Sequence, residues 1–150
     1  MPAIPPGRWI APRSMPVVTV LTYTTPELAD DLRLAGDVLL DAAVACDQPS
    51  FDISAVLSEV MPDGRVFEIA SGHRRVDAPA SPVRVSLRAV CARVPAGHRL
   101  RLSVAAGSFP FFPVNSGTGL EPARERLIDQ RILTLVLNHA GTILHLPIHS

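Results

Sequence analysis

The alternation of apolar and polar residues constrains this chain most, because from Val17 onward it has a period of two. A period of two places successive side chains on opposite faces of a β-strand. Clusters of Gly, Pro, Asp and Asn interrupt the alternation about every eight to twelve residues, which is typical of a sandwich or a barrel. Because helical periodicity is nearly absent, we predict an all-β domain.

The alternation predicts about eight to nine strands, each with one core face and one solvent face. The predicted strands are Val17–Thr24, Leu32–Leu34, Val38–Ala45, Phe51–Val60, Val66–Ala70, Val83–Val94, Arg99–Ala105, Arg131–Asn138 and Ile143–Ile148. Two strands show the alternation most clearly. The strand Phe51–Val60 is expected to carry Phe51, Ile53, Ala55 and Leu57 on its core face and Asp52, Ser54 and Ser58 on its solvent face. The strand Val83–Val94 is expected to carry Val83, Val85, Leu87, Ala89 and Cys91 on its core face and Arg84, Ser86 and Arg88 on its solvent face.

Turn chemistry marks the ends of several strands. In "MPDGR", Pro62 presets φ and Gly64 tolerates a positive φ, which predicts a hairpin. "AGD" at 35–37, "PAGH" at 95–98 and "NHAGT" at 138–142 predict further turns. The stretch 107–130 is rich in proline and glycine, so we expect a loop with one helical turn at "EPARERLI". A loop this long in a compact domain is usually functional or covers a sheet edge.

Length and apolar content indicate one domain. The chain has 150 residues and 47% hydrophobic content, enough for a single sizeable core. Residues 1–16 are proline-rich and predict an extended arm, pinned to the body by Trp9, ahead of a sandwich domain over 17–150. The start contains no uninterrupted apolar run, so we expect neither a signal peptide nor a membrane anchor, and a cytoplasmic location.

The charge balance excludes several partner classes. Fourteen acidic and fourteen basic residues leave no basic field for nucleic acid or an anionic membrane. Every basic residue is an arginine, which excludes catalysis by a lysine Schiff base. Cys46 and Cys91 lack CxxC spacing, so we expect two small buried apolar residues and neither a redox motif nor a zinc site.

The histidines do not form a convincing catalytic or metal-binding pattern. His98 follows a turn and could meet Asp52 across the sheet, but structural roles are expected for both. His139, His145 and His149 lack the further ligands that zinc requires, so no metal or cofactor is expected. His73 stands beside two arginines, which predicts an edge-strand charge cluster with an anion site as the lesser alternative.

The segment "FPFFPVN" (residues 109–115), which we call the phenylalanine loop, leaves two interpretations open. Phenylalanines in a loop usually plug the open end of a sandwich, which is the favoured interpretation. Stiffened by prolines, they could instead line an apolar pocket or a partner surface, to which Tyr23 would add a hydroxyl. The candidate ligand-binding residues are Tyr23, Phe109, Phe111, Phe112 and Asn115.

Three blocks, "VLTYTTPELADDLRLAGDVLL", "FDISAVLSEVMPDGR" and "VPAGHRLRLSVAAGSFPFFPVNSGTG", resemble the C-terminal domain of the X-Pro dipeptidyl-peptidase and cocaine-esterase-like (CocE/NonD) serine hydrolases. The positions that match the family pattern are Tyr23, Thr24, Asp31, Leu32, Gly36, Asp52, Ala55, Leu57, Pro62, Asp63, Gly64, Arg65, Ala96, Gly97, His98, Arg99, Arg101, Leu102, Phe109, Pro110, Phe112 and Asn115. The resemblance implies a jelly-roll sandwich of the galactose-binding-like type. In this family the catalytic triad sits in a separate α/β-hydrolase domain.

Two departures from the family matter for function. The chain has no G-x-S-x-G elbow, so no hydrolase activity can be assigned to any of its residues. Its phenylalanine loop is apolar where the family tends to carry charge. The first hypothesis is therefore a non-catalytic module that packs on an α/β-hydrolase partner, or on a second copy of itself, and forms part of a pocket wall. The alternative is a free-standing protein that binds an apolar small molecule and promotes a cyclisation or a proton transfer.

Overall fold

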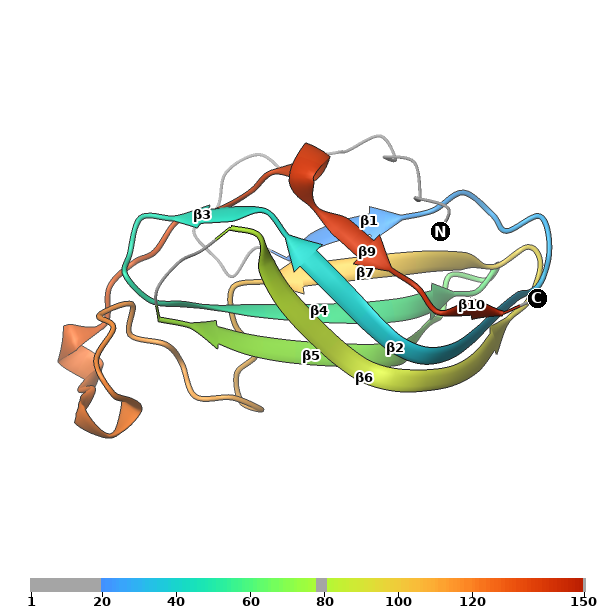
Figure 1. Cartoon of the computed structure of the whole chain (residues 1–150). Helices are drawn as coiled ribbons and strands as arrows, with labels where there is room; N and C mark the ends of the chain where they lie inside the picture. The colour runs from blue at the N-terminus through green and yellow to red at the C-terminus, as the bar shows by residue number, and fades with distance from the viewer. Residues whose placement is uncertain (1–19, 78–80, 150) are drawn as a thin grey trace.

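Antiparallel strands make up most of the computed structural model, which describes residues 20–77 and 81–149. The first sheet has the order β1-β7-β4-β5, and the second has the order β10-β2-β6, with β9 also paired to β2. Figure 1 shows these sheets as two layers, and the pair β3-β8 lies at one end. The strands are β1 (Leu21–Thr24), β2 (Leu32–Ala42), β3 (Val44–Cys46), β4 (Phe51–Val60), β5 (Val66–Val76), β6 (Val83–Val94), β7 (Arg99–Ala105), β8 (Leu135–Leu137), β9 (Ile143–His145) and β10 (Ile148–His149). The predicted all-β sandwich is confirmed.

The core fills the space between the two sheets. Phe51, Ile53 and Leu57 of β4 are fully buried, as are Leu40 of β2 and Val85 of β6. The period-two pattern therefore identified the core face of β4 correctly. The turn 61–65 between β4 and β5 is also as predicted, with Gly64 at φ 87°.

In β6 the set of side chains that faces the core changes halfway along the strand, which corrects part of the predicted core. The register passes from Gly36 opposite Val90 to Val38 opposite Leu87, so β6 has one residue more than β2 over this interval. Such a bulge reverses which side chains face the core. Cys91, expected inside, is therefore exposed, and so is Ala89. Cys46, also expected inside, is half-buried.

Several strand boundaries differ from the prediction. "AGD" at 35–37 is not a turn, because β2 runs through it with Gly36 at φ 128°. The last predicted strand is divided into β9 and β10, and the one before it shortens to β8. The strand is interrupted at 146–147, between β9 and β10. There the carbonyl of Pro147 accepts a hydrogen bond from the Ala35 amide. Residues 1–19, which include the predicted arm and Trp9, lie outside the described residues.

The β7–β8 connection (residues 106–134) positions the candidate site. It contains two short 3₁₀ turns, η1 (Pro122–Arg124) and η2 (Leu127–Asp129), where one helical turn was expected. In Figure 1 it is the orange segment that extends from the end of the sandwich opposite the chain's C-terminus. Among the described residues, no helix is long and apolar enough to span a membrane.

Candidate functional site

The phenylalanines of the β7–β8 connection face solvent. Phe109 and Phe111 are 76% and 86% exposed, and Phe112 is 42% exposed. The expectation that they plug the end of the sandwich is therefore wrong, because residues of the strands themselves already fill the core. These three side chains instead expose apolar area to solvent, which is the unusual feature of this end of the molecule.

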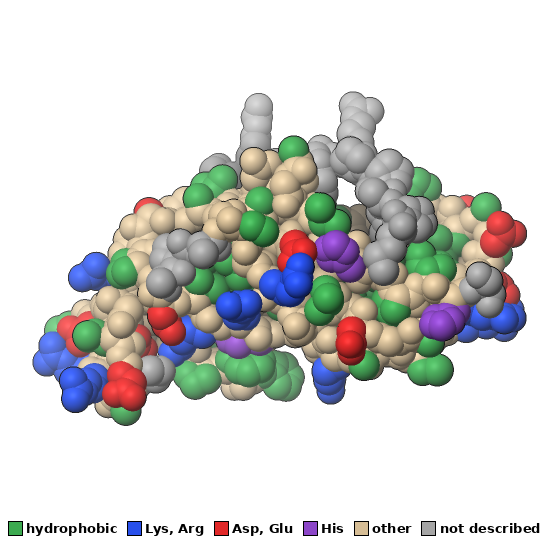
Figure 2. Space-filling model, viewed as in Figure 1, with side chains coloured by type: hydrophobic (Ala, Val, Ile, Leu, Met, Phe, Trp, Pro, Cys, Tyr) green, Lys and Arg blue, Asp and Glu red, His purple; other side chains and the backbone are tan. Residues whose placement is uncertain are grey.

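Exposed apolar residues are concentrated in this connection. Of the thirteen exposed large hydrophobic side chains among the described residues, seven belong to it: Phe109, Phe111, Phe112, Val114, Leu120, Ile128 and Ile132. We call these seven the apolar surface. Figure 2 shows hydrophobic side chains gathered at the lower edge of the molecule, where the light-orange part of the connection lies in Figure 1.

Asn115 anchors the phenylalanine loop to the first sheet. Its Nδ2 donates hydrogen bonds of 2.9 Å to Asp52 Oδ1 and to Ser50 Oγ. Its Oδ1 accepts a hydrogen bond from the Gly117 amide at 2.9 Å. Asn115 is buried, so these bonds are shielded from competing water. The predicted site residue Asn115 therefore holds the backbone of the loop in place.

Asp52 is the central acceptor beneath the loop. Besides Asn115, it accepts a hydrogen bond of 3.0 Å from Arg75 Nε on the neighbouring strand β5. Arg75 also reaches the carbonyl of Pro113 in the loop. Asp52 lies on the outer face of β4 as predicted, but it is 1% exposed, so the expectation of a solvent face is wrong. The loop and the Arg75 side chain cover it.

His73 of β5 forms the second contact with the loop. Its ring stacks on Phe112, and its Nδ1 lies 2.8 Å from Ser54 Oγ on β4. Burial lowers the pKa of His73, the nearby Asp52 carboxylate opposes this shift and Arg75 adds to it. Ser54, predicted to face solvent, is buried by this contact. His73 is thus part of a packed edge strand.

Serine, histidine and aspartate meet here, but without the geometry of a nucleophilic triad. His73 Nε2 is 3.7 Å from Asp52 Oδ2, and the Ser54 hydroxyl belongs to a buried side chain. A catalytic serine needs a substrate within reach of its oxygen. These residues hold the loop, consistent with the structural role expected for Asp52.

Tyr23 lies away from the phenylalanine loop. On β1 it is paired with the buried Leu102 of β7, so it faces the core side of the first sheet. Its hydroxyl lies 3.2 Å from His139 Nδ1, and burial raises the pKa of Tyr23. Phe112 packs on the opposite face of the same sheet, so Tyr23 does not join the phenylalanines in one pocket.

Two further histidines, His98 and His145, pair with carboxylates of neighbouring strands. His98 meets Glu59 of β4, and not Asp52, because Glu59 lies at the end of β4 next to the start of β7. His145 Nε2 lies 3.0 Å from Asp41 Oδ2 of β2. Within residues 20–77 and 81–149, no group of three or more metal-ligating side chains converges.

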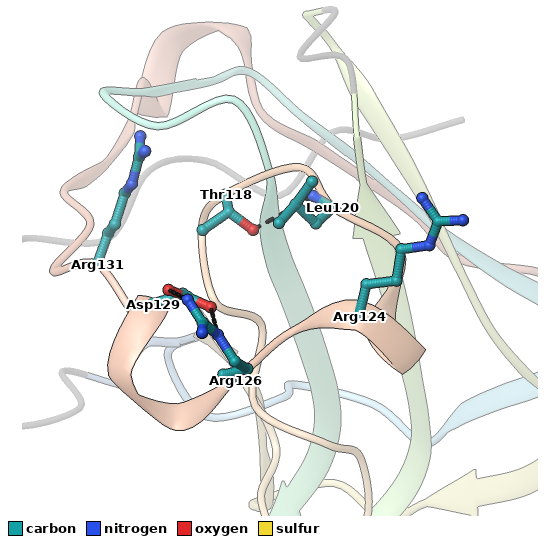
Figure 3. A pocket seen from close by; sticks show the side chains of 6 residues that line it. All are labelled: Thr118, Leu120, Arg124, Arg126, Asp129 and Arg131. Atoms are coloured by element: carbon teal, nitrogen blue, oxygen red, sulfur yellow. Dashed lines mark hydrogen bonds and ion pairs between the residues drawn. The ribbon is translucent and has the colours of Figure 1, made fainter.

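A hollow of about 640 Å³ lies in the same connection, and no sequence motif drew attention to it. Its lining residues are Thr118, Leu120, Arg124, Arg126, Asp129 and Arg131. In Figure 3, Arg131 and Arg124 stand on opposite sides, with Thr118 and Leu120 between them and Arg126 bound to Asp129 below. The spacing of the arginines in "EPARERLIDQR" was the available signal. Sequence reasoning missed the hollow because its shape depends on how the loop folds back.

Comparison with known proteins identifies the family. Residues 18–140 match the model of the X-Pro dipeptidyl-peptidase C-terminal non-catalytic domain. The cocaine esterase of Rhodococcus sp. (strain MB1 Bresler) is 30% identical over 121 residues, which cover 72% of this chain and 21% of that protein. The chain therefore spans about a fifth of this curated relative.

Solved structures share the fold. An aminopeptidase from a marine sediment Thaumarchaeota archaeon superposes with a TM-score of 0.78 at 22% identity, covering 87% of this chain and 26% of that one. An α-amino acid ester hydrolase gives a TM-score of 0.78 at 19% identity, covering 87% and 25%. A CocE/NonD family hydrolase from Staphylococcus aureus gives 0.60 at 13% identity, covering 87% and 30%. The match of residues 18–140 to the family model decides the assignment: this chain belongs to the X-Pro dipeptidyl-peptidase C-terminal non-catalytic domain family.

Proposed function

We propose that this chain is a packing module that docks on an α/β-hydrolase domain through the apolar surface of its β7–β8 connection. The observation that carries the proposal is the concentration of exposed Phe109, Phe111 and Ile132 side chains in that one connection. Burying apolar area of this kind is the main driving force for protein association. The module supplies a surface and no bond-making residue.

The anchoring of the loop supports a docking role. The contacts of Asn115 with Asp52 and of Phe112 with His73 hold the loop on the first sheet before any partner arrives. Preorganisation of this kind reduces the entropy lost on binding. A rigid apolar surface bordered by arginines has the composition of a docking surface, in which an apolar centre is surrounded by a polar rim.

The family supports the class of partner. The relatives that share this domain are hydrolases of which it forms about a fifth to a quarter. We therefore choose an α/β-hydrolase domain as the occupant, and a second copy of this chain is an outcome of the test. A cytoplasmic location remains our proposal, supported by free thiols at Cys46 and Cys91, because reduced cysteines are typical of that compartment.

The test uses a chimera in which this chain replaces the matched region of the Rhodococcus cocaine esterase. Thermal unfolding is followed for the chimera and for this chain alone. We expect the module to unfold at a higher temperature in the chimera, because docking stabilises the folded state. The double variant Phe109→Ser with Phe111→Ser should remove this gain and leave the isolated chain unchanged, because both side chains are exposed.

Phe67→Ser is the matched control, an exposed phenylalanine on β5 outside the connection, and it should leave the gain intact. Equal unfolding temperatures in the chimera and the isolated chain would reject docking on a hydrolase. Sedimentation of the isolated chain covers the other occupant. A dimer that becomes a monomer in the double variant would assign the apolar surface to a second copy.

A further inference from the structure

The hollow in the β7–β8 connection has an unequal charge distribution. Arg126 is neutralised by Asp129, whose two carboxylate oxygens accept hydrogen bonds of 2.8 Å and 3.0 Å from its guanidinium. No carboxylate of the described residues lies within ion-pair distance of Arg124 or Arg131. The Arg131 guanidinium donates instead to the uncharged amide oxygen of Gln48, at 3.5 Å. Two cationic groups therefore border the hollow without an internal counter-charge.

Hydrogen bonds inside the connection maintain the shape of the hollow. The buried Ser116 donates from its hydroxyl to Glu125 Oε1 at 2.6 Å, and its carbonyl accepts the Arg131 amide at 2.9 Å. Thr118 Oγ1 accepts a hydrogen bond from the Leu120 amide at 3.2 Å. Glu125 is thereby held by Ser116, while Arg124 and Arg131 stand on opposite sides of the hollow (Figure 3).

We propose that this hollow is a carboxylate site that receives an acidic segment of the hydrolase partner, with one carboxylate on Arg124 and another on Arg131. This inference rests on the proposed docking function. Guanidinium groups bind carboxylates through paired hydrogen bonds in a plane, which compact ammonium groups cannot do. Placed on opposite sides of the hollow, the two arginines suit an extended segment with two acidic side chains better than a small single anion.

The hollow and the apolar surface belong to the same connection and share one residue, which supports one partner for both. Leu120 lines the hollow and is one of the seven exposed apolar residues. An apolar centre with charged pairs at its border is the common arrangement of protein interfaces, and the charged pairs contribute orientation and selectivity.

The experiment titrates the whole chain with the peptide acetyl-Glu-Gly-Glu-amide and follows backbone amides by NMR. We expect saturable shifts at residues 118–131, and none with acetyl-Gln-Gly-Gln-amide. Arg124→Gln and Arg131→Gln should each weaken binding about fivefold, as expected for an exposed charged pair. Arg33→Gln, an exposed arginine of β2 away from the connection, should leave binding unchanged.

Equal binding of the two peptides, or an equal effect of Arg33→Gln, would overturn the carboxylate site. If the peptide does not bind while the chimera still shows the phenylalanine-dependent gain in stability, the site is rejected and docking stands. If that gain is absent, the hydrolase partner is rejected, and this inference falls with it.

Discussion

The imidazole ring of His73 lies parallel to the phenyl ring of Phe112, with 3.8 Å between ring centroids and 6° between planes. This contact joins β5, an edge strand of the first sheet, to the phenylalanine loop. Together with the hydrogen bonds between Asn115 and Asp52, it keeps an exposed apolar segment in a defined position. The position of the loop is thus controlled by residues of β4 and β5 beneath it.

Replacing Phe112 by Ala should lower the free energy of unfolding by about 1 kcal/mol, since a stacked aromatic pair contributes about that much and the ring is half-exposed. Phe111→Ala is the control and should have no measurable effect, because Phe111 makes no such stack and is 86% exposed. Urea unfolding measures both. A loss of 3 kcal/mol or more at Phe112, of the order found for a core phenylalanine, would show that the ring is buried in solution.

The stability of the fold should decrease as the pH falls below the ordinary histidine pKa of 6.5. Burial lowers the pKa of folded His73, so the unfolded chain binds the proton first and the contribution of the neutral ring is lost as the pH falls through the folded-state pKa. Urea unfolding between pH 7.5 and 5 measures the decrease. His73→Gln should reduce the slope, and an unchanged slope in that variant would assign the pH dependence to other groups.

Asp52→Ala should be strongly destabilising, by about 3 kcal/mol, because it leaves Arg75 and Asn115 without their shared acceptor in a buried position. Glu27→Ala removes one partner of an exposed ion pair with Arg99 and should cost less than about 1 kcal/mol. Chemical unfolding of the two variants gives the comparison. Similar small losses at both positions would mean that water reaches Asp52.

Gly72→Ala should destabilise the sandwich, because a Cβ on Gly72 would lie 2.3 Å from the carbonyl oxygen of Ser86 on β6. Backbone atoms cannot move aside as side chains do, so we expect a loss of at least about 2 kcal/mol. Gly107→Ala is the control, with open space at the same position. If both variants have the same melting temperature, β5 and β6 are further apart than the structure places them.

Much of the fold could be predicted from local sequence. The core face of β4, the hairpin at 61–65 and the all-β class follow from alternation and turn chemistry, which act over a few residues. The bulge in β6 was not predictable in this way. It arises from the register against β2, and register depends on a strand that is distant in the sequence.

In the candidate site too, local sequence predicted some features, while others depend on how distant strands pair. The sequence marked Phe109, Phe111, Phe112 and Asn115 as unusual, but it did not indicate whether they face the core or the solvent. It also could not separate Tyr23 from them, because faces of a sheet are assigned only when the strands pair. The cover over Asp52 comes from a loop 63 residues further along the chain.

By itself, the sequence determined the period of the side chains, the places where the chain turns and the absence of a nucleophile elbow. The tertiary structure decided which polar residues are buried, that the phenylalanines are exposed and that Arg124 and Arg131 border one hollow. The physical reason is that periodicity and turn propensity are local properties of the backbone. Burial and charge pairing depend on segments that meet only after the sheets have formed.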